Sequence, residues 1–193
     1  IVSRKKLQAS KLNRLRSAKG QIVDVSQMDL VRTGHLEHGD PLPFLIQPAV
    51  AHVDLADWLT GNMKLIQETL LQHGAILFRD FQIDSVTKFE AVATSLCSDL
   101  FRDYEDLPQE ENSNQVYAST PYPQDESILF HNESSHMHRW PMKQFFCCLT
   151  AAHKGGETPL VDCRKVYELM NPGIRKQFEQ KQLMYVRNFT DGL

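Results

Sequence analysis

The spacing of apolar residues between positions 53 and 74 predicts two consecutive helices. The first begins at Val53 and runs through DLADWLT. The second is expected over MKLIQETLLQH, opened by Asn62 and ended by Gly74, which favours a helix C-terminus. Its predicted core face carries Leu65, Ile66, Leu70 and Leu71.

A strand and a third helix are expected next. AILFRDF is apolar and aromatic, which is typical of a strand. Ser85 then has the residue type and position to cap a helix over VTKFEAVATSLC, with Phe89, Val92 and Leu96 on its apolar face. On the N-terminal side, the sequence predicts a short strand over QIVDV and a short helix over QMDLVR capped by Ser26. The prolines of GDPLPFLIQP predict a loop, and residues 103–112 an acidic loop.

From Val116 the pattern changes to β. Strands are expected in VYAST, SILFHNESS, KQFFCCLTA, ETPLVD and LMYVRNF, with helices over RKVYELM and GIRKQFEQ separated by Asn171-Pro172. Helices come first and strands gather later. This order favours an α+β, mainly β fold with a helix-flanked β core over an alternating βαβ fold.

Composition and charge narrow the classes of protein. The chain has 193 residues, 41% hydrophobic and 23% charged, which excludes collagen, coiled-coil, disordered and membrane classes. No apolar run approaches the length of a membrane span. The net charge of −3 argues against a nucleic-acid binder, although residues 1–20 hold seven basic side chains and no acids. A basic arm is able to bind phosphate or anionic lipid; the alternative is that it lies, frayed or helical, on its own acidic domain, residues 21–193.

The four cysteines do not form a metal or redox motif. No two of them form a C-x-x-C pair, and all four lie in apolar stretches: Cys97, Cys147, Cys148 and Cys163. Buried free thiols in the reducing cytoplasm are the expectation.

The densest polar cluster is His131-Asn132-Glu133-Ser134-Ser135-His136-Met137-His138. In an extended backbone, His131 and Glu133 share a face and can approach one ion. They would supply two thirds of a 2-His-1-carboxylate triad on Fe(II). The alternatives are a solvated loop, a di-iron site using Glu133-x-x-His136 on a long helix, and a zinc site using His131, His136 and His138.

A second motif is Gly155-Gly156-Glu157-Thr158-Pro159. The glycines permit a tight turn, and the Thr158 hydroxyl is able to bond a ligand carboxylate. The alternative is a simple hairpin turn. The motif lacks the G-K-[ST] ending of a phosphate loop.

Together these pieces resemble the TauD/TfdA family of Fe(II)- and 2-oxoglutarate-dependent dioxygenases. The resemblance rests on HGAILFRDF, FEAVATSL, YASTPYP, LFHNESS, WPMKQFFCC and GGETPLVDCRKVYELM in that order, from about Gln21 onward. It implies a double-stranded β-helix (jelly roll) with N-terminal helices. The similarity is greatest to the branch of syringomycin-type amino-acid β-hydroxylases from nonribosomal peptide clusters.

The resemblance assigns roles to three residues. His131 and Glu133 match the H-x-D/E iron ligands, and Thr158 matches a threonine that touches the cosubstrate carboxylate. Related halogenases replace the acid with a small residue, so Glu133 implies hydroxylation. The family's second histidine and its cosubstrate arginine lie far beyond GGET, and His153, Arg139, Arg164, Arg175 and Arg187 do not match them.

The jelly roll is therefore expected to be incomplete in this chain, which begins with Ile rather than Met. We expect the 193 residues alone not to form a stable, active monomer. The implied substrate is an amino acid or an amino-acid derivative, free or tethered to a peptidyl carrier protein, in secondary metabolism. The candidates for lining the substrate pocket are the acidic loop and the polar residues Ser119, Thr120 and Tyr122. Four aromatic residues are candidates for the pocket wall or for core packing: Phe130, Trp140, Phe145 and Phe146. The alternatives are a non-catalytic scaffold of the same fold and a zinc-binding cupin-like protein.

Overall fold

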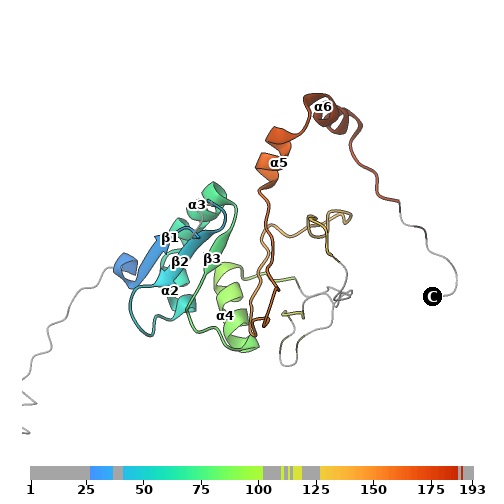
Figure 1. The fold of residues 1–193 in the computed structure, drawn as a ribbon. Helices are drawn as coiled ribbons and strands as arrows, with labels where there is room; N and C mark the ends of the chain where they lie inside the picture. The colour runs from blue at the N-terminus through green and yellow to red at the C-terminus, as the bar shows by residue number, and fades with distance from the viewer. Residues whose placement is uncertain are drawn as a thin grey trace, which may run out of the picture.

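The computed structural model describes residues 27–36, 41–101, 110, 113, 115–118, 127–186 and 188 (Figure 1). Several predicted features lie outside these residues: the basic arm 1–20, the strand over 21–25, Ser26, Ser119, Thr120, Tyr122, Arg187 and all of the acidic loop 103–112 except Glu110.

The N-terminal part of the described chain is built on a three-stranded sheet. A short 3₁₀ helix, η1 (Gln27–Leu30), leads directly into β1 (Val31–Gly34). The central strand β2 (Phe44–Pro48) pairs antiparallel with β1 and parallel with β3 (Ile76–Phe78). A parallel pair requires a crossover connection, and two helices provide it here.

Local capping signals explain where these helices begin and end. The Asp54 carboxylate accepts from the backbone N–H of Asp57 at 3.0 Å and starts α2 (Leu55–Gly61). α3 (Met63–His73) ends at Gly74, whose φ of 82° is the left-handed geometry that glycine adopts without a steric cost. Ser85 caps α4 (Val86–Leu96) through the N–H of Lys88. These three helix predictions are confirmed.

The buried core lies between the sheet and these helices, with α2 packed on α4 (Figure 1). Ile46 of β2 and Leu59 of α2 are its largest fully buried side chains. The other buried members are Val31, Leu55, Trp58, Ile66, Phe81 and Val92. On α3 the buried residues are Ile66 and Thr69, whereas Leu71 is 79% exposed, so its predicted place on the core face is wrong.

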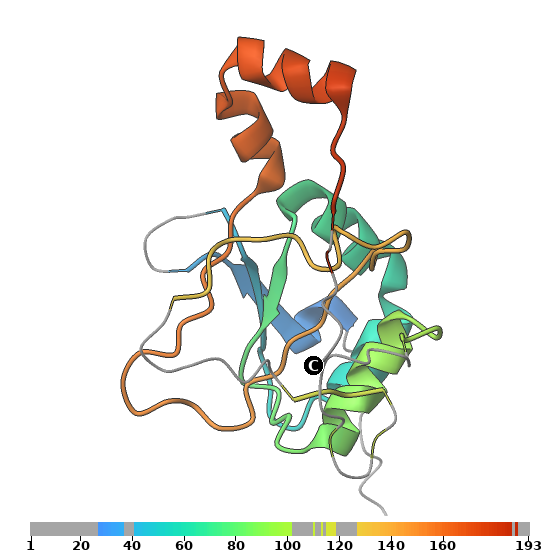
Figure 2. The same ribbon diagram turned by 90° about the vertical axis from the view of Figure 1, so that its right-hand side faces the viewer.

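The C-terminal part carries a helical hairpin that stands away from the sheet (Figures 1 and 2). Asp162 caps α5 (Cys163–Leu169), and Asn171 caps α6 (Pro172–Lys181), as the Asn-Pro boundary predicted. The Tyr167 hydroxyl donates to the Glu179 carboxylate across the hairpin. Among the described residues from 127 to 186, none is buried.

Two predictions about strands are wrong. Residues 44–48, predicted as loop, form the central strand, because Pro43 and Pro48 lie at its boundaries and leave Leu45, Ile46 and Gln47 free to pair. In the described parts of the expected strands from Val116 onward, Tyr117 forms an isolated β-bridge and no extended strand is present, so the strands of the described chain come first and the helical hairpin last. The observed β2–α2–α3–β3 unit is thus the parallel arrangement that the order of elements had disfavoured.

The cysteines are free, as expected, but only partly buried. Cys97 and Cys147 are half-buried, whereas Cys148 and Cys163 are exposed. Partial burial, together with the neighbouring Cys148 thiol, raises the pKa of Cys147.

Candidate metal site

His131 and Glu133 lie at the entrance to a turn. Residues 127–132 have no regular secondary structure, and 133–136 form a turn closed by the Met137 N–H, which donates to the Ser134 carbonyl at 2.9 Å. Ser134 adopts a φ of 53° within it. The extended strand expected through Glu133 is therefore wrong, because no described strand pairs with this segment.

The turn nevertheless brings the two predicted ligands together. His131 Nε2 lies 3.8 Å from Glu133 Oε2. Adjacent ligands of one octahedral ion, each about 2.1 Å from it, lie about 3 Å apart. A small side-chain adjustment is therefore enough for both atoms to bind one ion. The two side chains are 60% and 26% exposed, so water and small ligands reach them.

The backbone selects the form of His131 that a metal requires. His131 Nδ1 lies 2.8 Å from the Leu129 carbonyl oxygen. A carbonyl can only accept, so Nδ1 carries the hydrogen, and in the neutral ring Nε2, 3.8 Å from Glu133 Oε2, keeps a lone pair that can bind a metal. Metal-binding histidines commonly have this arrangement, because the second hydrogen bond fixes the tautomer and ring orientation. The donor set of one imidazole nitrogen and one carboxylate oxygen fits a ferrous ion.

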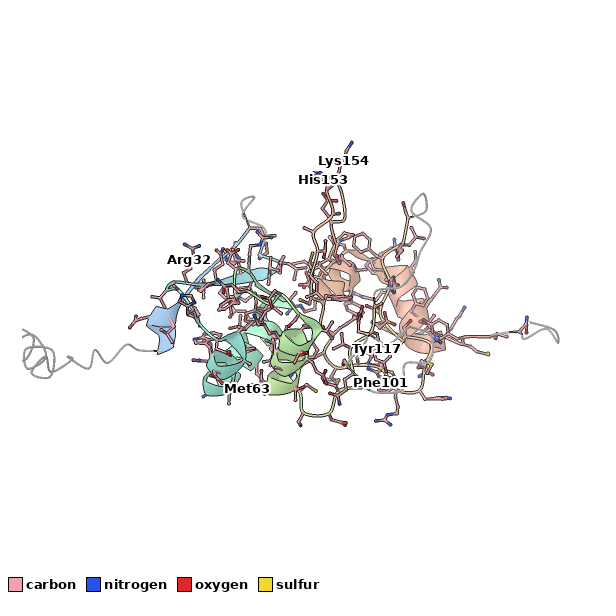
Figure 3. The ribbon with its side chains drawn as sticks, turned by 90° about the horizontal axis from the view of Figure 1, so that it is seen from below. Arg32, Met63, Phe101, Tyr117, His153 and Lys154 are labelled. Carbon is pink, nitrogen blue, oxygen red and sulfur yellow. The ribbon has the colours of Figure 1, made fainter. Side chains whose placement is uncertain are left out.

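The two rival metal sites are not assembled in the described residues. No three His, Cys, Asp or Glu side chains within the described ranges lie close enough to hold an ion, so the zinc cluster of His131, His136 and His138 is not formed there. Glu133 and His136 lie in a turn rather than on the long helix that a di-iron site needs. His153 lies at the tip of a projecting loop beside Lys154 (Figure 3).

The Gly-Gly turn is confirmed in its backbone, though not as a strand hairpin. Gly155 and Gly156 have φ values of 71° and 80°. A Cβ on Gly156 would lie 2.7 Å from the Ala152 Cβ, closer than real side chains approach, so this position requires glycine. The turn leads to Thr158, which is exposed in a segment without regular secondary structure.

The aromatic residues near the ligand pair do not pack into a core. Phe130 and Trp140 are each 64% exposed and Phe146 is 70% exposed, while Phe145 is half-buried. The core-packing alternative is therefore wrong for the first three. Their role as a pocket wall stays a prediction.

Three contacts at this site escaped the sequence prediction. The Cys163 thiol donates to Asn132 Oδ1 at 3.3 Å, and Asn132 lies between the two predicted ligands. The Tyr185 hydroxyl lies 3.3 Å from Ser135 Oγ, and its ring lies 6.4 Å from that of His136. The residues of these pairs are 31 to 50 positions apart, so no local sequence pattern predicts the contacts.

Comparison with known proteins decides the family. Residues 38–193 match the family described as taurine catabolism dioxygenase TauD, TfdA family. The chain belongs to this family. Two relatives resemble it over 76% of its length: dapdiamide synthesis protein DdaC from Enterobacter agglomerans, 37% identical, and a clavaminate synthase-like protein from Arabidopsis thaliana, 27% identical. The matched regions cover 48% of each relative, so the chain spans about half the length of these relatives.

Family membership implies a jelly roll, and the described three-stranded sheet with its helices is a partial α/β structure consistent with it. Within the described residues, no helix has the length and apolar content needed to cross a membrane.

Proposed function

We propose that this chain carries the first two metal ligands of an Fe(II)- and 2-oxoglutarate-dependent oxygenase. The observation that carries the proposal is the facing pair of His131 Nε2 and Glu133 Oε2, 3.8 Å apart, in a member of the TauD/TfdA family. The Leu129 carbonyl supports it by keeping His131 in the tautomer that binds a metal.

Each residue has a distinct role in this proposal. When bound, iron with 2-oxoglutarate supplies the activation of dioxygen for hydroxylating an unactivated C–H bond. His131 provides a neutral nitrogen and Glu133 an anionic oxygen, while the Thr158 hydroxyl hydrogen-bonds a cosubstrate carboxylate. Glu133 occupies the position that a halide would need, which favours hydroxylation over halogenation. The third ligand and the cosubstrate arginine come, in this proposal, from outside the 193 residues.

The proposed substrate is an amino acid or an amino-acid derivative, free or attached to a carrier protein. The Enterobacter relative is named for the synthesis of dapdiamide, which supports a biosynthetic rather than a catabolic role. The basic arm at residues 4–19 would then meet an acidic carrier. Reversing its charge should weaken turnover of the carrier-bound substrate and leave that of the free amino acid unchanged.

Metal binding provides the direct test. Anaerobic titration of the purified protein with Co(II), followed by its visible absorption, should show a site that 2-oxoglutarate perturbs. His131→Ala or Glu133→Gln should weaken binding by more than about tenfold, because each removes a direct ligand. His153→Ala is the matched control, since this histidine is exposed at the tip of a projecting loop, and it should leave Co(II) binding unchanged.

The outcomes separate the candidate functions. Binding that depends on His131 and Glu133, accompanied by succinate release when amino acids are supplied, supports the oxygenase. Tight zinc binding whose affinity does not change when 2-oxoglutarate is added indicates the cupin-like alternative. Equal metal binding by wild type and His131→Ala contradicts the proposal and leaves the non-catalytic scaffold.

A further inference from the structure

Arg164 joins the C-terminal part of the chain to the end of α3. Its Nη1 donates to the carbonyls of Leu71 and Gln72 at 3.0 and 3.3 Å, and its Nη2 donates to Gln72 at 3.3 Å. These carbonyls belong to the last turn of α3, where the helix offers no N–H partner. A cation at this position also complements the helix dipole. α5 begins beside the end of α3 in both views of the ribbon (Figures 1 and 2).

Asp162 holds the guanidinium in this orientation. Arg164 Nε donates to Asp162 Oδ1 at 2.9 Å, and Nη2 donates to Oδ2 at 2.8 Å. With the α3 carbonyls, all five N–H groups of the guanidinium have acceptors. A lysine ammonium has no planar fork to reproduce this pattern. The hydrogen bonds from Arg164 lower the pKa of the Asp162 carboxyl, so it is ionised at neutral pH.

The residue between this pair touches the candidate metal site. Cys163 Sγ donates to Asn132 Oδ1, and Asn132 is flanked by His131 and Glu133. Thr158 precedes Asp162 by four positions on the same segment. One short segment, residues 158–164, therefore connects the end of α3, the ligand turn and the threonine proposed to bind cosubstrate.

We propose that Arg164 and Asp162 are positioning residues of the metal site, fixing the 158–164 segment on α3 so that Cys163 holds the ligand turn through Asn132. This inference rests on the proposed function for its consequence at the metal, but its geometric part stands alone. The effect of Arg164 and Asp162 passes through Cys163 and Asn132.

The first test measures whether Arg164 keeps the two segments together. In a protein with Cys97, Cys147 and Cys148 changed to serine, Asn132→Cys should close a disulfide with Cys163 rapidly in oxidised glutathione. Adding Arg164→Ala should slow closure on the order of tenfold, because the effective concentration of the two thiols falls. Arg164→Lys should restore part of the rate. Lys165→Ala is the matched control, since the Lys165 ammonium forms its ion pair with Glu168 on α5, and it should close at the parent rate.

The second test uses Co(II) affinity in proteins that keep Asn132. Arg164→Ala and Asp162→Asn should weaken binding by about tenfold, as supporting residues of metal sites do. With Trp140 changed to phenylalanine, urea unfolding followed by fluorescence of the buried Trp58 should still show a folded protein at the urea-free condition of the Co(II) titration, which separates positioning from a loss of folding. The inference is overturned if the disulfide closes at the same rate with and without Arg164. It is also overturned if Arg164→Ala slows closure but leaves the Co(II) affinity unchanged. If the wild type binds no Co(II), the proposed function fails, and the closure rates alone decide whether Arg164 holds the turn.

Discussion

Shortening Leu59 to alanine should destabilise the sheet-and-helix layer far more than the same change at Leu71. Leu59 is 0% exposed in the core between α2, α4 and the sheet, whereas Leu71 on α3 is 79% exposed. Both residues are leucines within helices, so helix propensity changes equally in the two variants. The difference between them therefore isolates burial.

The magnitude follows from that burial. Removing three buried carbons loses about 2 kcal/mol of transfer free energy, at roughly 0.8 kcal/mol each. The residual cavity adds about 1 kcal/mol more, because a packed core relaxes only in part, which gives about 3 kcal/mol in all. Leu71→Ala should change the free energy of unfolding by less than about 0.5 kcal/mol. With a urea slope of about 2 kcal/mol per molar, the midpoint should fall by about 1.5 M for Leu59→Ala.

Trp58 provides the signal for this measurement. It is 3% exposed in the same core, while the second tryptophan, Trp140, is 64% exposed and can be replaced by phenylalanine as a background change. Urea unfolding followed by Trp58 fluorescence then reports the core alone. Equal midpoint shifts for the two leucine variants would refute the assignment of Leu59 to the core.

Two further predictions concern the segments around the candidate site. Gly156→Ala should disturb the 150–160 loop and speed its hydrogen exchange, because the new Cβ would lie 2.7 Å from the Ala152 Cβ. Gly155→Ala is the control, since Gly155 has the same left-handed φ but its Cβ would lie 3.9 Å from the Glu157 carboxylate. Equal effects of the two variants on hydrogen exchange would contradict this geometry. The hydrogen bonds from Arg164 lower the pKa of the Asp162 carboxyl from its ordinary 3.8. The stabilisation from these hydrogen bonds is therefore complete above pH 3.8, and it is lost as the pH falls through the lower pKa of the folded protein. The NMR shift of Arg164 Nε–H should therefore titrate with a midpoint below 3.8, and a midpoint at or above that value would show that the pair is not formed.

The helices were predictable because their signals are local. Ser85, Gly74 and the Asn171-Pro172 boundary act within one helical turn, and the structure confirms them at these positions. The cap at Asp54 was not predicted, because the helix was expected to begin at Val53. The central strand β2 was not predictable, because its stabilising partners at residues 31–34 and 76–78 are distant in sequence and its flanking prolines favour a loop locally. The prediction of which α3 side chains are buried was wrong at Leu71 for the same reason. Periodicity identifies an apolar face but does not identify which residues of that face contact the core.

The candidate site divides in the same way. The residue types His131, Glu133 and Thr158, and the need for glycine in the turn before Thr158, are properties of the sequence itself. The local backbone of the turn sets the distance between His131 Nε2 and Glu133 and the contact of His131 with the Leu129 carbonyl, each of which spans two positions. Tertiary structure decided that Cys163 reaches Asn132. It also placed Arg164 on α3, more than 90 positions away in the chain. Sequence patterns record interactions within a few residues, whereas the contacts that hold the ligand turn in place exist only after distant segments have packed together.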